Sequence, residues 1–111
     1  MRMQVDELDG GVTKVTLEGD LDAKGSGEIE VSFAAITGAR LKLVVDMSLV
    51  GFLASIGIRT LLSAAKTVTR RGGKLVLSGA NADVTKVLEV SGAAQLLTLA
   101  AGQDEALAAL A

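Results

Sequence analysis

The chain has 111 residues, with 11 Lys or Arg against 13 Asp or Glu and a formal net charge of −2. It contains no His, Cys, Trp, Tyr or Pro, which excludes a disulfide framework, a thiolate nucleophile, a histidine base and a zinc site with the usual ligands. Without aromatic stacking platforms or net positive charge, direct nucleic-acid binding is not expected. We therefore predict one domain over residues 1–111 that is not an enzyme and has no catalytic residues, metal or cofactor.

No targeting or membrane segment is expected. Asp6 and Glu7 fall where a signal peptide would begin its apolar stretch. The most apolar region, residues 41–62, is interrupted by charged and polar residues and cannot supply the roughly 20 apolar residues of a membrane-spanning helix. We predict a cytoplasmic protein without membrane insertion.

The first third of the chain predicts a hairpin followed by a helix. Residues 12–18 alternate apolar and polar side chains, which is the period of a half-buried strand. Residues 4–8 can supply an antiparallel partner strand through the turn at residues 9–11. Ile29, Phe33 and Ile36 then form one face of a helix, which we expect Gly38 to close.

The middle of the chain predicts a buried strand and an amphipathic helix. Residues 41–46 are almost continuously apolar, as in a central parallel strand. The helix is expected to begin with Ser55 as its N-cap and to end at Gly72 and Gly73, with Arg70 and Arg71 favourably placed near its C-terminus. Its predicted buried stripe is Ile58, Leu61, Leu62, Ala65 and Val68.

The last third predicts a strand at residues 74–78, a helix capped by Asn81 and ending at Gly92, a short strand at residues 96–99 and a helix at residues 104–110. Helices between strands imply crossover connections and hence a largely parallel sheet. The expected fold class is a small α/β domain with a mixed, mostly parallel sheet of four to five strands and about four helices. The pattern leaves the strand order open.

The segment with the clearest functional signal runs from residue 46 to residue 62. It passes from a predicted strand, through a short loop, to a helix N-terminus, the edge of an α/β sheet where ligands and partners are usually received. Ser55 lies at or next to the N-cap, where backbone N–H groups and the helix dipole would favour a phosphate. Gly57 allows a close approach to the backbone.

Two motifs resemble the signature of the STAS family, the sulfate transporter and anti-sigma factor antagonist domains. The first motif begins with the sequence Asp-hydrophobic-Ser. A segment that contains a Phe and the phospho-acceptor serine follows, and then an amphipathic helix. The residues that match this motif are Asp46, Ser48, Phe52, Ser55, Gly57 and Ile58. The second is the family's Gly-Glu-hydrophobic-Asp segment, which Gly19, Leu21 and Asp22 match, with Asp20 in place of the commoner Glu. The spacing out to residues 105–107 also fits, so the resemblance covers essentially the whole chain.

The resemblance implies an anti-sigma factor antagonist that works by partner switching. Such a protein binds a serine-kinase type of anti-sigma factor while Ser55 is unmodified, and phosphorylation of Ser55 releases it until a phosphatase resets the switch. The partner-binding residues implied are Asp22, Ser55, Ile56, Gly57 and Arg59. The protein is expected to be a monomer or weak dimer.

Structural interpretations compete at several of these positions. Ser55 can be a helix cap alone, and Asp22 a turn or cap residue. Asp46 and Ser48 can simply satisfy backbone hydrogen-bonding groups at the end of the strand. Phe52 is expected to anchor a loop on the core, and Arg59 to be solvated.

Two residues also support an alternative function. The family's usual acidic residue before the phospho-acceptor is Ala54 here, and the small residue after it is Ile56. These departures favour a non-phosphorylated adaptor, such as the STAS subunit of a transporter or lipid-transport ATPase complex. A scaffold role in a larger stress-sensing assembly is less expected from a chain this short.

Overall fold

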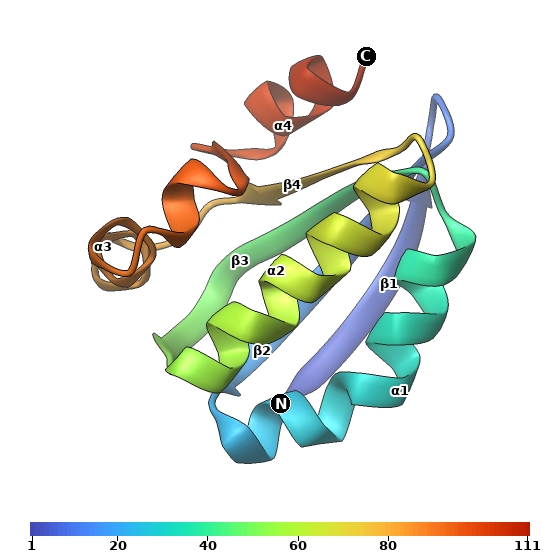
Figure 1. The fold of residues 1–111 in the computed structure, drawn as a ribbon. Helices are drawn as coiled ribbons and strands as arrows, with labels where there is room; N and C mark the ends of the chain where they lie inside the picture. Colours follow the sequence, from blue (N-terminus) through green and yellow to red (C-terminus); the bar gives the residue numbers. More distant parts are fainter.

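The computed structural model describes residues 1–111 as four α-helices and a five-stranded sheet, which agrees with the predicted fold class (Figure 1). The elements in chain order are β1 (Arg2–Leu8), β2 (Val12–Leu21), α1 (Ala23–Ala39), β3 (Lys42–Leu53), α2 (Ser55–Arg70), β4 (Lys74–Ser78), α3 (Ala82–Val90), a 3₁₀-helix (Ala93–Gln95), β5 (Thr98–Ala100) and α4 (Gln103–Leu110).

The order of the strands in the sheet is the order of the strands in the chain, β1-β2-β3-β4-β5. The hairpin β1–β2 is antiparallel, as predicted, and every other neighbouring pair is parallel. Parallel neighbours need a crossover. The segments that supply these crossovers are α1 before β3, α2 before β4, and α3 with the 3₁₀-helix before β5.

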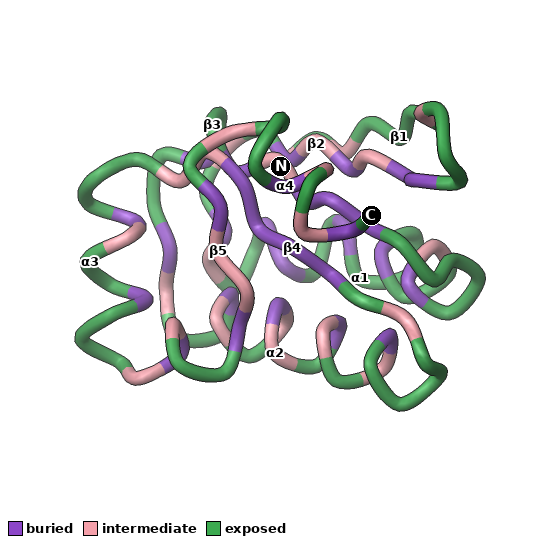
Figure 2. Tube along the Cα trace, turned by 90° about the horizontal axis from the view of Figure 1, so that it is seen from above, coloured by how far each residue is buried: buried purple, intermediate pink, exposed green.

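The sheet separates two apolar layers of unequal size. The larger core has 19 buried residues between the sheet and helices α1, α2 and α3, whereas α4 covers a smaller cluster on the other face. Side chains alternate along β3, so that Leu43 and Val45 enter the larger core while Val44 enters the smaller one. Figure 2 shows α2 and α4 on opposite sides of the buried middle of the sheet.

The termini of the helices agree with the predictions in part. Asn81 caps α3, because its side-chain oxygen accepts the N–H of Val84 at 2.8 Å. The prediction that Gly38 ends α1 is wrong: the helix continues to Ala39, and the N–H of its C-cap, Arg40, donates to Ile36. The Arg71 guanidinium supports this end by donating to two α1-terminal carbonyls at 2.9 Å.

Two predictions, the buried stripe of α2 and the start of the last strand, differ from the structure by one or two residues. The buried residues of α2 are Gly57, Leu61, Ala64 and Val68. The predicted stripe is therefore shifted by one residue at two positions, since Gly57 and Ala64 are buried where Ile58 and Ala65 were predicted. Ile58, Leu62 and Ala65 are half-buried at the margin of the stripe. The last strand begins at Thr98 and not at Leu96, because Leu96 is the C-cap of the preceding 3₁₀-helix and is exposed.

Candidate functional site

The C-terminal half of β3 forms the base of the candidate site. Residues 47–53, predicted as a loop, continue the strand by pairing with β2, with register shifts between Thr16 and Glu18 and between Gly19 and Asp20. The prediction that Phe52 packs on the core is wrong, since its side chain is 55% exposed. Leu53, the next residue, takes the inward position at the end of the strand, and the alternation of a strand turns Phe52 outward.

Ser55 is the first residue of α2, so the prediction that it caps the helix is wrong, whereas its placement next to the N-cap is confirmed. The N-cap is Ala54, which has an extended backbone and no side-chain hydrogen bond. The Ala54 N–H donates to the Leu21 carbonyl at 3.1 Å, and its own carbonyl accepts the N–H of Ile58 at 3.0 Å. This tie to β2 sets the helix start at Ser55, whose exposed hydroxyl is left without a capping role.

Gly57 is buried and allows α2 to approach the end of β2 closely. A Cβ at this position would lie 2.3 Å from the Leu21 carbonyl oxygen and 2.8 Å from Leu21 Cγ. Because Gly57 is buried, any contribution it makes to the predicted partner surface is indirect, through the placement of the exposed Ser55 and Ile56 that precede it.

Asp22 lies at the same edge of the sheet and has a capping role. Its Oδ1 accepts the Gly25 N–H at 2.8 Å and makes it the N-cap of α1. Leu21 and Leu53, the last residues of β2 and β3, are paired in the ladder. Asp22 and Ala54, which follow them directly, therefore lie at the same edge of the sheet. The structure thus brings the starts of α1 and α2, and with them the two motifs, to the same edge of the sheet.

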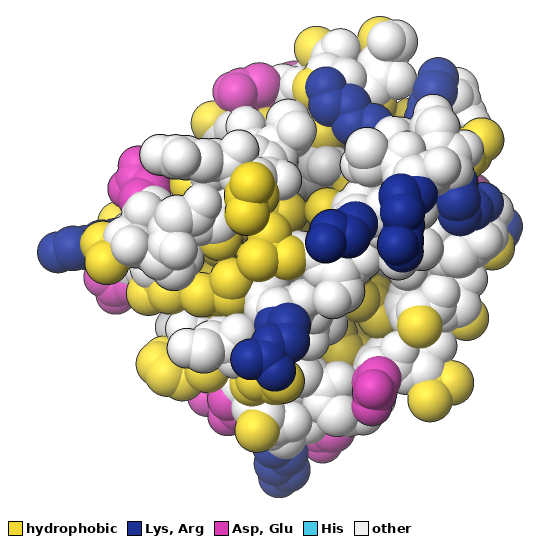
Figure 3. Space-filling model, viewed as in Figure 1, with side chains coloured by type: hydrophobic (Ala, Val, Ile, Leu, Met, Phe, Trp, Pro, Cys, Tyr) yellow, Lys and Arg dark blue, Asp and Glu magenta, His cyan; other side chains and the backbone are white.

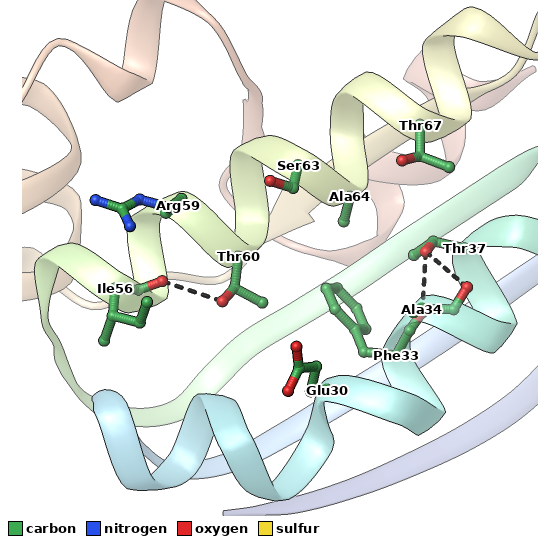
Figure 4. Close-up of a pocket in the computed structure, with 10 residues that line it drawn as sticks. All are labelled: Glu30, Phe33, Ala34, Thr37, Ile56, Arg59, Thr60, Ser63, Ala64 and Thr67. Atoms are coloured by element: carbon green, nitrogen blue, oxygen red, sulfur yellow. Dashed lines mark hydrogen bonds between the residues drawn. The ribbon is translucent and has the colours of Figure 1, made fainter.

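Two grooves run along opposite sides of α2. The groove toward α1 has a volume of about 290 Å³ and includes Ile56 and Arg59 in its lining (Figure 4). The groove toward α3 has a volume of about 690 Å³, and Ser55 lies in its wall. The first turn of α2 therefore presents Ser55 to one groove and its neighbour Ile56 to the other.

The groove toward α3 is largely apolar, a feature that sequence reasoning missed. Phe52, Val87 and Val90 line it and are 55%, 36% and 79% exposed. Figure 3 shows hydrophobic side chains gathered between α3 and α2. The available signal in the sequence was the pair Val87 and Val90, whose spacing of three residues places them on one side of α3.

The exposed face of α2 carries only positive charge. The helix has no acidic residue, and Arg59, Lys66 and Arg70 recur at spacings that place them on one face. None of these three residues takes part in an ion pair. Arg59 is thus solvated as expected, and the helix surface near Ser55 favours an anionic ligand or partner.

Asp46 is held in the middle of β3 and not at its end. Its Oδ1 accepts the Ser48 N–H at 2.9 Å, and its Oδ2 lies 3.6 Å from Lys14 Nζ. Partial burial by itself raises the pKa of Asp46, but hydrogen bonding from Ser48 and the charge of Lys14 outweigh it. The net result is a pKa below the ordinary value of 3.8.

This environment predicts a pH-dependent contribution to stability. Because the pKa is lower in the folded state, the contribution is fully present above the unfolded-state pKa of about 3.9 and is lost as the pH falls through the folded-state pKa. We expect Asp46→Asn to lower the urea midpoint at pH 7 and to differ less from the parent near pH 3. Asp9→Asn, in the exposed hairpin turn, is the control. Parallel pH profiles for parent and Asp46→Asn would contradict the prediction.

The fold and this strand-to-helix site define a class of small α/β domains, and comparisons with known proteins agree. The family model described as "Mlab, STAS domain" matches residues 5–99. The chain belongs to the STAS domain family. None of its helices has the length and apolar character needed to cross a membrane.

Three relatives illustrate the similarity. A protein of Bordetella bronchiseptica named as an anti-sigma factor antagonist, BtrV, is 27% identical, over 98% of this chain and 94% of its own. The crystal structure of an anti-sigma factor antagonist from Mycobacterium paratuberculosis has a TM-score of 0.87 at 25% identity, covering 98% and 92% of the two chains. Bacillus SpoIIAA in its phosphorylated form has the same fold, with a TM-score of 0.71 at 20% identity over 99% and 100% of the two chains.

Proposed function

We propose that this protein is an anti-sigma factor antagonist whose binding surface is centred on Ser55. The unmodified protein binds an anti-sigma factor that is also a serine kinase, phosphorylation of Ser55 releases that partner, and a phosphatase restores binding. The exposure of Ser55 at the first residue of α2, with its hydroxyl free of any capping role, is the observation that carries the proposal.

The surroundings of Ser55 suit a docking surface. Phe52 on one side and Ile56 on the other are exposed apolar residues, which can be buried against a partner. Arg59, one turn further along α2, adds an unpaired positive charge that can meet an acidic partner surface. Apolar contacts around a small hydroxyl form an interface that a new charge would disturb strongly.

A phosphate on Ser55 should leave the fold intact. It adds about −1.5 to −2 charges at the positive end of the helix dipole, where anions are favoured. The cost of the modification therefore falls on the complex. A thousandfold loss of affinity requires about 4 kcal/mol. An exposed ion pair supplies only about 0–1 kcal/mol, so Ser55 must be enclosed by the partner in this proposal.

The test is affinity capture with the unmodified protein, followed by incubation of the captured complex with ATP and mapping of the phosphorylated residue. One phosphate is expected, at Ser55. Ser55→Ala should abolish labelling, whereas Ser63→Ala, which removes another exposed serine of the same helix, should leave it unchanged. Equal labelling of Ser55→Ala and the parent would overturn the site assignment.

A second candidate function is a constitutive adaptor that binds without phosphorylation, for example the STAS subunit of a transporter ATPase. Ala54 favours it, because the position next to Ser55 is held against β2 and offers no carboxylate to a kinase. Capture of a transporter ATPase, together with an unphosphorylated native protein, would support the adaptor and exclude the switch.

A further inference from the structure

The outer edge of β1 is an unused hydrogen-bonding surface. β1 is a seven-residue strand at the end of the sheet, with β2 as its only neighbour. An edge strand of this length presents unpaired N–H and C=O groups that can recruit a further strand. The opposite edge, β5, has only three residues. The structure therefore has one long free edge.

The side chains of β1 alternate between the two faces of the sheet, and residues 2–6 separate polar from apolar side chains. Arg2, Gln4 and Asp6 lie on one face, opposite Glu18, Thr16 and Lys14 of β2. Met3, Val5 and Glu7 lie on the other face, where Met3 packs against the larger core and Val5 is 39% exposed. Glu7 is already bonded to Thr13 and Arg40 within the chain. The polar set begins with a cation and ends with an anion, with an amide between them.

This arrangement is complementary to itself. In an antiparallel pair of two β1 strands centred on Gln4, Arg2 of each copy lies opposite Asp6 of the other. Met3 lies opposite Val5 in the same way, and the two Gln4 side chains meet at the two-fold axis. Opposite charges and apolar pairs at directly facing positions stabilise antiparallel strands. We infer that β1 pairs with β1 of a second copy in this register, giving a weak symmetric dimer with a continuous ten-stranded sheet.

Other registers lose the complementarity. A shift of the centre by one residue to Val5 places Met3 opposite Glu7 and Gln4 opposite Asp6. A shift by one residue to Met3 leaves Arg2 facing Gln4. A register centred between two residues pairs even-numbered with odd-numbered positions, so that a charged side chain faces an apolar one. Over residues 2–6, only the Gln4-centred register matches charge with charge and apolar with apolar on both faces.

The neighbouring helix leaves the edge accessible. Glu28 of α1 contacts the N-terminal amine of Met1, which identifies the side of α1 that faces β1. Ser32, Ala35 and Ala39 follow on the same side of the helix by spacing, and all three are exposed and small. They leave room for the helix of a second copy.

The proposed interface is separate from the Ser55 surface. β1 and α3 lie at opposite sides of the molecule, and β2 separates β1 from the strand that leads to Ser55 (Figure 1). A dimer would keep two free partner surfaces, so this inference does not depend on the proposed function.

The chain has no cysteine, so a single introduced cysteine reports on the pairing directly. In the Gln4-centred register the two residues 4 face each other at a Cα distance of about 4.5–5.5 Å, within the reach of a disulfide. The two residues 6 lie about 14 Å apart, four positions of about 3.4 Å each, which is beyond that reach. Under mild oxidation we expect Gln4→Cys to form a covalent dimer at least tenfold faster than Asp6→Cys, on non-reducing gels at about 100 µM protein.

Charge reversal supplies a second, non-covalent test by sedimentation velocity. Asp6→Arg should weaken the dimer of the otherwise unaltered chain, because it places two arginines opposite each other. Arg2→Asp should weaken the dimer in the same way, because it places two carboxylates opposite each other. An equimolar mixture of the two variants should form heterodimers, because the carboxylates of one chain then face the guanidinium groups of the other, while the contacts within each chain are the same alone and mixed. Equal crosslinking of the two cysteine variants, no crosslinking of Gln4→Cys, or a mixture as monomeric as either variant alone would each overturn the inference.

Discussion

Ser55→Asp is expected to weaken binding of the anti-sigma partner about a thousandfold, or about 4 kcal/mol, and to leave the free energy of unfolding almost unchanged. The two effects separate because the residue lies at a helix start and not in the core. An added carboxylate in the first turn of α2 interacts favourably with the helix dipole, by about 0.3–1 kcal/mol. The same charge must lose its water if a partner encloses the position, and that cost appears only in the complex.

Isothermal titration with the captured partner and urea denaturation of the free protein measure the two quantities. Ser32→Asp is a matched control, since Ser32 is an exposed serine on the side of α1 away from α2 and should affect neither. A loss of stability of several kcal/mol in Ser55→Asp would show that Ser55 has a structural role. Unchanged affinity would place Ser55 outside the interface.

Gly57→Ala is expected to destabilise the fold by about 2 kcal/mol, although alanine is the better helix former. Helix propensity alone would stabilise the variant by about 1 kcal/mol. The new methyl group would lie 2.3 Å from the Leu21 carbonyl oxygen and 2.9 Å from Leu53 Cδ1. α2 must move away from β2 to admit it, and overpacking of this kind costs up to about 3 kcal/mol. The movement would also displace Ser55 from its place beside the β2–β3 edge.

Gly38→Ala is the matched control, because it makes the same substitution where no atom lies within 4 Å. It should stabilise α1 by about 0.5–1 kcal/mol, since only the propensity difference remains. Urea denaturation of both variants therefore tests the close approach by the sign of the change. An increase of stability in both would show that α2 does not press against β2.

Much of this fold could be predicted from the sequence because its signals are local. The Asn81 cap, the alternation of residues 12–18 and the apolar run of residues 74–78 each depend on neighbours within a few positions. Periodicity and capping act over such distances, and helices between strands then require a largely parallel sheet. The motif around Ser55 indicated the candidate functional segment by the same kind of short-range evidence.

Contacts between distant segments decided the remaining features, and no short-range pattern reports them. The strand order depends on which strands pair, and residues 47–53 are a strand only because β2 lies beside them. Phe52 is exposed for the same reason, since its direction depends on the register of that ladder. The hydrogen bond from Ala54 to Leu21 moved the N-cap off Ser55 and left its hydroxyl free. The sequence by itself thus determined the fold class and the candidate serine, whereas the tertiary contact between β2 and the start of α2 decided how that serine is presented.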